Sequence, residues 1–112
     1  MAKVAWIGMG RVGRQMALSV LRAGHSLTGH ARTPSRHADA QAAGANVTAS
    51  IQAAVRGAEV VCVNVYSEDQ MVDAMLGSGA LAAMESGSVL AIHSTVGPFA
   101  VREIALARPD VH

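Results

Sequence analysis

Short apolar runs alternate along the chain with longer segments whose apolar residues recur at helical spacing. The apolar runs predict strands at 3–7, 25–31, 45–48, 59–66 and 88–93. The intervening segments predict helices at 12–23, 33–44, 50–58, 67–77, 80–87 and 97–110. The run EVVCVNVY at 59–66 is apolar nearly throughout, which is typical of a central parallel strand that is buried on both faces.

The regular alternation of strand and helix predicts an α/β fold of the Rossmann type. We expect a doubly wound parallel sheet with the strand order 3-2-1-4-5. Residues 1–112 are predicted to form one incomplete, N-terminal nucleotide-binding domain that is truncated before a sixth strand. The apolar strand at 88–93 carries no charge to protect its edge, and we expect that edge to be exposed.

Composition narrows the class of protein. The chain is 51% hydrophobic but only 3% aromatic, which predicts an aliphatic core. Its formal net charge of +1 argues against a protein that binds nucleic acids or membrane surfaces through its overall charge. The single cysteine, Cys62, excludes an internal disulfide and is predicted to be an inert core thiol. No spanning segment, signal peptide or metal site is predicted, so we expect a cytoplasmic protein.

Three glycines follow the first predicted strand in the stretch VAWIGMGRVGRQMA. Gly8, Gly10 and Gly13 form a GxGxxG pattern between a predicted strand and a predicted helix, the context that a dinucleotide-binding turn requires. Gly8 would allow the tight turn, Gly10 the approach of a diphosphate, and Gly13 the packing of helix on strand. Free amide groups at Arg11 and Val12 would then face the phosphates. The alternative is a plain strand-turn-helix corner.

The end of the second predicted strand indicates which dinucleotide would bind. A cofactor with a free 2′-hydroxyl favours an acidic residue roughly 20 residues beyond the turn. The sequence there is GHARTPSR, and no carboxylate follows until Asp39. Arg32, with Thr33 beside it and Arg36 one turn later, suits a 2′-phosphate. We therefore predict NADP(H) rather than NAD(H), the alternative being solvated surface arginines.

The fourth and fifth predicted strands deliver NVYS and HSTVGP to the same edge of the sheet. Ser94 and Thr95 are hydroxyl donors where a nicotinamide ribose or a substrate carboxylate would lie, or they cap the helix that begins at Pro98. Tyr66 would cover the cofactor or shield the sheet. His93 is a poor candidate for an acid or base.

These motifs together resemble the β-hydroxyacid dehydrogenases, the 3-hydroxyisobutyrate dehydrogenase family. WIGMGRVGRQMALSVLRAGHSLTGHART resembles the opening of these enzymes, and HSTVGP resembles their ST…P element. The resemblance covers the whole chain, which corresponds to roughly the first third of a two-domain enzyme. It implies that Ser94 faces substrate and that the cofactor contacts are Gly8, Met9, Gly10, Arg11, Val12, Gly13, Ala31, Arg32, Thr33, Arg36, Val65, Tyr66 and Thr95.

The sequence departs from this family at several positions. Val12 replaces the usual Met, Tyr66 replaces Pro, and Ile92 stands where Asp is frequent, which leaves the substrate less defined. By the resemblance, the catalytic lysine and the dimerising helical domain of a homo-oligomeric parent would lie beyond this chain. Lys3, the only lysine, lies at the wrong end of the first strand. We therefore expect this chain to bind cofactor without completing a catalytic site.

The resemblance implies the cofactor domain of an NADP(H)-dependent oxidoreductase, with NAD as a possible cofactor. Hydride would pass to or from a small 3-hydroxy acid or its aldehyde, that is, a small-molecule carboxylate or carbonyl substrate. An imine reductase is an alternative, since these enzymes share the N-terminal pattern and lack the lysine. A non-catalytic nucleotide sensor and an α/β interaction domain are alternatives of other classes. HSTVGP favours an enzyme, because a sensor needs no substrate-side hydroxyls.

Overall fold

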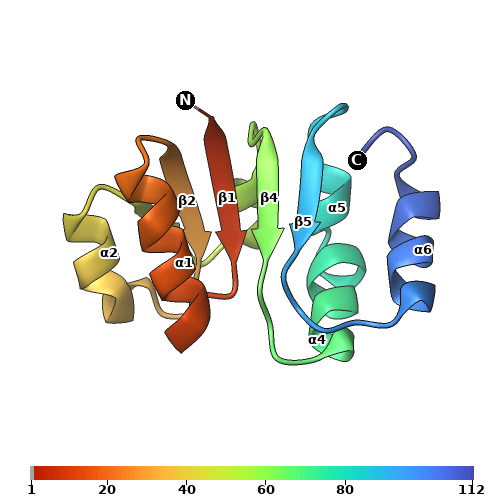
Figure 1. Cartoon of the computed structure of the whole chain (residues 1–112), viewed down its shortest axis with the longest axis horizontal. Helices are drawn as coiled ribbons and strands as arrows, with labels where there is room; N and C mark the ends of the chain where they lie inside the picture. The colour runs from red at the N-terminus through yellow and green to blue at the C-terminus, as the bar shows by residue number, and fades with distance from the viewer. Residues whose placement is uncertain (1) are drawn as a thin grey trace.

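The computed structural model describes residues 2–112, which form a five-stranded parallel sheet. The strand order is β3-β2-β1-β4-β5, and all four strand pairs are parallel, as the sequence predicts. All the visible strand arrowheads point toward one edge of the sheet (Figure 1). The strands are β1 (Lys3–Ile7), β2 (Ser26–His30), β3 (Asn46–Thr48), β4 (Val60–Val63) and β5 (Val89–Ile92).

Helices connect every pair of consecutive strands, and some are more irregular than the sequence predicts. They are α1 (Arg11–Arg22), the 3₁₀ turn η1 (Pro34–His37), α2 (Ala38–Ala42), α3 (Ile51–Val55), α4 (Glu68–Val72), the π turn η2 (Asp73–Gly77), α5 (Ala80–Ala83) and α6 (Pro98–Ala107). The single helix expected at 67–77 is thus divided. The Ser78 amide donates to the carbonyl of Asp73, five residues earlier, at 2.7 Å, which widens the last turn.

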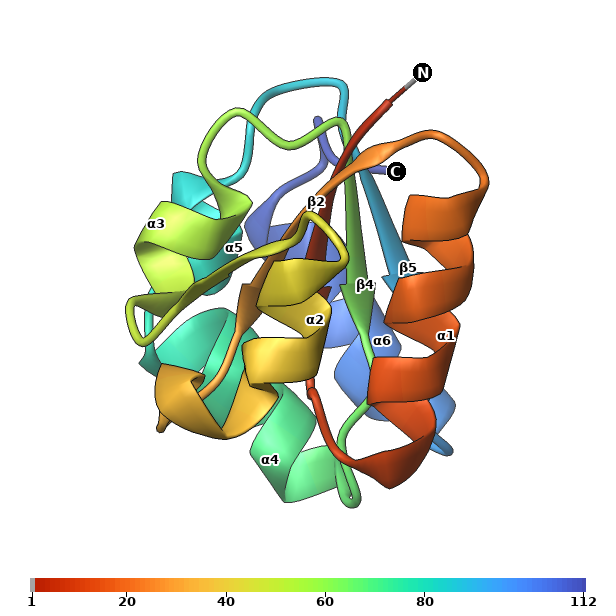
Figure 2. The ribbon, with the colours of Figure 1, turned by 90° about the vertical axis from the view of Figure 1, so that its left-hand side faces the viewer.

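Helices cover both faces of the sheet (Figure 2). On one face, α1 and α2 enclose a cluster that includes Trp6, Leu27 and Cys62. On the other face, α3 to α6 enclose a larger aliphatic cluster that includes Val61 and Met71. Burial raises the pKa of the Cys62 thiol, which confirms the predicted core position. None of the helices in residues 2–112 has the length and apolar character needed to cross a membrane.

The edge of β5 is partly covered, so the expectation of an exposed edge is wrong for the first half of this strand. The Leu90 amide donates to the His112 carbonyl at 2.8 Å, and the His112 amide donates to the Ser88 carbonyl at 2.9 Å. His112 therefore pairs with β5 in the parallel pattern. The residues after α6 turn back beside the strand and satisfy backbone groups that would otherwise face solvent.

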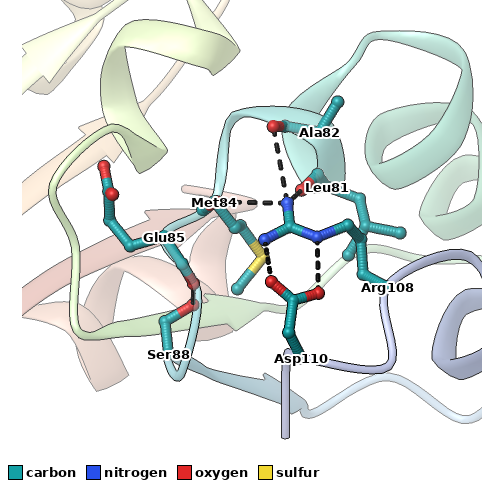
Figure 3. A network of polar contacts seen from close by, with 7 residues as sticks. All are labelled: Leu81, Ala82, Met84, Glu85, Ser88, Arg108 and Asp110. Atoms are coloured by element: carbon teal, nitrogen blue, oxygen red, sulfur yellow. Dashed lines mark hydrogen bonds and ion pairs between the residues drawn. The ribbon is translucent and has the colours of Figure 1, made fainter.

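Arg108 holds this returning segment in place (Figure 3). Its guanidinium donates to the carbonyls of Leu81 at 2.8 Å and Met84 at 3.1 Å, at the carboxyl end of α5. It also makes two parallel bonds with the Asp110 carboxylate, at 2.9 and 2.8 Å. One planar cation thus satisfies carbonyls that a four-residue helix leaves free, and orients the chain toward β5.

We predict that Asp110 stabilises the fold at neutral pH and loses this effect in acid. The hydrogen bonds from Arg108 hold the Asp110 pKa well below its ordinary value of 3.8. A carboxyl with a lowered folded-state pKa stabilises the fold above its unfolded pKa, and the effect is lost as pH falls through the folded value. Urea unfolding should therefore show Asp110→Asn less stable than the parent at pH 7.

The difference in unfolding free energy between the parent and Asp110→Asn should narrow as the pH falls below about 4. Arg108→Ala should be less stable than both the parent and Asp110→Asn at pH 7, because the carbonyls of α5 also lose their hydrogen-bond donor. Equal stability of parent and Asp110→Asn at pH 7 would contradict this account. Asp69→Asn is the matched control, since Asp69 is an exposed acid outside this network.

Candidate functional site

The turn between β1 and α1 lies at the carboxyl edge of the sheet and packs backbone against backbone. Gly8 has φ +101°, and a Cβ on it would lie 1.8 Å from the carbonyl oxygen of Asn64, just after β4. A Cβ on Gly13 would lie 1.9 Å from the carbonyl oxygen of Gly8. Both positions therefore exclude any side chain, and the predicted packing role of Gly13 is confirmed.

Gly10 differs from Gly8 and Gly13 because a side chain there would meet another side chain and not backbone. It is the N-cap of α1, with an ordinary extended conformation at φ −72° and ψ −170°. A Cβ there would meet only Tyr66, whose hydroxyl oxygen would lie 3.2 Å away. No side chain caps α1, and its first turn holds no acidic residue. The amides of Arg11 and Val12 have no acceptor within the helix, so this end carries the positive pole of the helix dipole.

Trp6 supports the turn from below, a role that the sequence did not reveal. The side chain is 1% exposed, and its Nε1 would lie 3.2 Å from a Cβ on Gly13. Within residues 2–112 this Nε1 has no hydrogen-bond partner. The ring stacks on His93 with centroids 5.5 Å apart and planes 15° apart. His93, which follows β5 and is exposed, thus packs one face of its ring against the tryptophan.

The loop after β2 presents the predicted cationic residues. Ala31 is buried, and its amide donates to the Thr48 carbonyl at 3.0 Å. Arg32 and Arg36 are exposed, and no carboxylate within residues 2–112 forms an ion pair with either. Burial, with a smaller contribution from the Arg32 charge, lowers the pKa of His30 at the end of β2. The His30 imidazole is therefore favoured in its neutral form.

Two hydrogen bonds join the loop after β4 to the loop after β5. The Val65 amide donates to Ser94 Oγ at 2.8 Å, and the Gly97 amide donates to a Glu68 carboxylate oxygen at 2.6 Å. Gly97 is the N-cap of α6 and has no side-chain capping bond. The alternative in which Ser94 or Thr95 caps α6 is therefore wrong. Glu68 places its charge at this helix end, which the sequence analysis missed.

The remaining predicted residues differ in exposure. Met9 is buried, and its sulfur would lie 3.0 Å from a Cβ on Gly29, so only its backbone is available to a ligand. Val12 is 64% exposed and Tyr66 is 90% exposed, so Tyr66 does not shield the sheet. Val65 is half-buried against the larger cluster, whereas Thr95 and Thr33 are exposed.

A glycine turn that ends in an open helix N-terminus, at the carboxyl edge of a 3-2-1-4-5 sheet, defines a dinucleotide-binding α/β domain. Comparison with known proteins agrees with this class. Residues 3–108 match the NAD binding domain of 6-phosphogluconate dehydrogenase. The chain therefore belongs to this family of NAD-binding domains, whose members are oxidoreductases.

Relatives of the chain include dehydrogenases and imine reductases. The NAD-dependent L-serine dehydrogenase of Pseudomonas aeruginosa is 33% identical over 96% of this chain and 36% of its own length. The structure of Mycobacterium tuberculosis 3-hydroxyisobutyrate dehydrogenase with L-serine superposes with a TM-score of 0.87 at 25% identity, over 99% of this chain and 38% of that one. The Streptomyces aurantiacus imine reductase gives 0.80 at 29% identity, over 97% and 39%. The chain thus spans well under half of each relative.

We predict that alanine at Gly10 and at Gly13 will have different effects. Gly10→Ala should fold normally, because its Cβ meets only the end of an exposed tyrosine. It should weaken dinucleotide binding about tenfold or more by holding phosphate away from the backbone amides. Gly13→Ala should lose about 1–3 kcal/mol or more of stability, because its Cβ overlaps the Gly8 carbonyl.

Urea unfolding gives the stability of each variant, and fluorescence titration with NADPH gives its affinity. The two variants serve as controls for each other, since neither glycine has a positive φ and only a Cβ on Gly13 meets backbone. Full NADPH affinity in Gly10→Ala would show that phosphate does not approach this backbone.

Proposed function

We propose that this chain is the cofactor-binding domain of an oxidoreductase that binds NADP(H) and acts on a small 3-hydroxy acid or its aldehyde. A nicotinamide cofactor, when bound, supplies or accepts the hydride. The residues of this chain bind and orient the cofactor and present one hydroxyl toward the substrate. The observation that carries the proposal is the open amino end of α1, where Gly10 leaves room beside the uncapped amides.

The preference for NADP(H) rests on the loop after β2. Arg32 and Arg36 are exposed and have no carboxylate partner within residues 2–112, so their guanidinium groups are available to a 2′-phosphate. Asp39, the first carboxylate after β2, is paired with Arg14 at 3.2 Å and lies in α2. It is therefore a poor acceptor for the ribose hydroxyl that NAD presents. The Pseudomonas relative is NAD-dependent by name, so a direct comparison of the two cofactors is the decisive measurement.

Ser94 is the proposed contact to substrate. Its oxygen accepts a hydrogen bond from the Val65 amide at 2.8 Å, which leaves the hydroxyl proton free to be donated. A carbonyl or carboxylate oxygen of a small substrate is a suitable acceptor. We call the site formed by the β1–α1 turn and the loops after β4 and β5 the mouth. Lys3 begins β1, at the opposite end of the strands from this mouth. We therefore propose that an acid or base from elsewhere in a longer protein completes the reaction, and that this chain alone is inactive.

An imine reductase is the second candidate. The similarity to the Streptomyces enzyme supports it. Both candidates place the same cofactor in the same turn and differ in the group that meets the substrate. A chain that contains the complete substrate site, assayed with 3-hydroxyisobutyrate and with a cyclic imine, distinguishes them.

We predict that Arg32→Asp will change the preferred cofactor from NADP(H) to NAD(H). Loss of the guanidinium should weaken NADPH binding by about 10- to 100-fold, as expected for a charged hydrogen bond. The new carboxylate should improve NADH binding by accepting from the ribose hydroxyls. Trp6 is the only tryptophan and lies beneath the turn, so energy transfer from it to the reduced nicotinamide reports binding directly.

Arg102→Asp is the matched control, because it makes the same charge change on an exposed residue of α6. It should shift both affinities little. Unchanged NADPH affinity in Arg32→Asp would contradict the proposed preference, even if dinucleotide binding itself persists.

A further inference from the structure

Tyr66 occupies a position that packing does not explain. It follows β4 and is 90% exposed, although burial of an aromatic ring is a large source of stability. Its hydroxyl nevertheless lies over the glycine turn, 3.2 Å from where a Cβ on Gly10 would be, and its Cζ lies 3.9 Å from the same point. Within residues 2–112, and apart from the adjacent chain, Tyr66 atoms are the only ones within 4 Å of that point.

The backbone beneath this ring is fixed on both sides. The Tyr66 amide donates to the side-chain oxygen of Gln70 at 2.8 Å, and the Gln70 amide donates to Ser67 Oγ at 3.2 Å. The preceding amide, at Val65, is held by Ser94. The loop thus has a defined path that places the exposed ring over the glycine turn. An exposed ring held over the turn from an anchored loop is the arrangement of a side-chain lid.

The chemistry of the mouth matches a phenol. The amino end of α1 carries unsatisfied amides, and neither an acidic residue in its first turn nor a side-chain cap neutralises it. A diphosphate bound there accepts hydrogen bonds from the amides on one side and leaves oxygens facing solvent on the other. The Tyr66 hydroxyl lies over Gly10, and a phenol can donate a hydrogen bond.

We propose that Tyr66 closes over the bound dinucleotide and donates its phenolic proton to a diphosphate oxygen, which slows release of the cofactor. The inference rests on the proposed cofactor site and assigns it a second, side-chain wall opposite the glycine turn. Because the contact is to the diphosphate, it is independent of whether the adenosine carries a 2′-phosphate. Tyr66 therefore sets affinity and residence time, whereas Arg32 sets the choice between cofactors.

The test is to titrate the parent chain, Tyr66→Phe and Tyr66→Ala with NADPH, NADH and adenosine 2′-monophosphate. Tyr66→Phe keeps the ring and removes only the donor, so NADPH and NADH should both bind about 2- to 12-fold more weakly, with faster dissociation in stopped flow. Adenosine 2′-monophosphate has no diphosphate, so its affinity should not change. Tyr66→Ala should weaken both dinucleotides at least as much.

The outcomes separate this inference from the proposed function. If the parent binds neither NADPH nor NADH, the cofactor site itself is wrong. If the parent binds both and Tyr66→Phe binds them equally well, the lid is wrong and the cofactor site stands. Tighter binding by Tyr66→Phe or Tyr66→Ala would show that the side chain obstructs the mouth, which also overturns the inference. Thermal unfolding should be nearly unchanged in Tyr66→Phe, because the hydroxyl makes no intramolecular bond that the fold requires.

Discussion

The mouth of this domain depends on one close contact, between the backbone of the β1–α1 turn and the backbone that follows β4. The Cα of Gly8 lies against the Asn64 carbonyl, and Gly13 lies against the carbonyl of Gly8. Three backbone segments are therefore stacked with no side chain between them. This stack packs α1 closely against the sheet. The amino end of α1, which carries the positive end of the helix dipole, therefore lies at the carboxyl ends of the strands.

The loops around this stack are joined to each other by side chains. Ser94 holds the loop after β4, and Glu68 holds the start of α6. Trp6 and His93 join β1 to the end of β5 beneath the mouth. Each contact spans different strands, so a shift of one loop displaces the others. The result is a rim whose loops are joined to one another, on which the side chains of Tyr66 and Arg32 are exposed.

Local chemistry was predictable from the sequence, whereas contacts between distant segments were not. Ser50 caps α3 by accepting from the Ala53 amide at 3.2 Å, and Pro98 opens α6, because both effects depend on neighbouring residues alone. The bond between Glu68 and Gly97 spans 29 residues, and only the packed fold brings the two together. The same holds for Arg108 and the α5 carbonyls, and so the partial cover of β5 could not be foreseen.

One side of the mouth is formed by backbone and the other by side chains, and this difference affects which parts of the site a substitution can change. The glycine turn is made of backbone, because Gly8 and Gly13 leave no room for a side chain there. The side that we propose for substrate presents side chains, among them the Ser94 hydroxyl, whose oxygen accepts from the Val65 amide. In this proposal, a substitution among those side chains alters the choice of substrate and leaves the backbone contacts of the glycine turn in place. The chain is similar in fold to both a 3-hydroxyisobutyrate dehydrogenase and an imine reductase. This agrees with the division, because side chains around a site can differ between proteins that keep the same backbone turn.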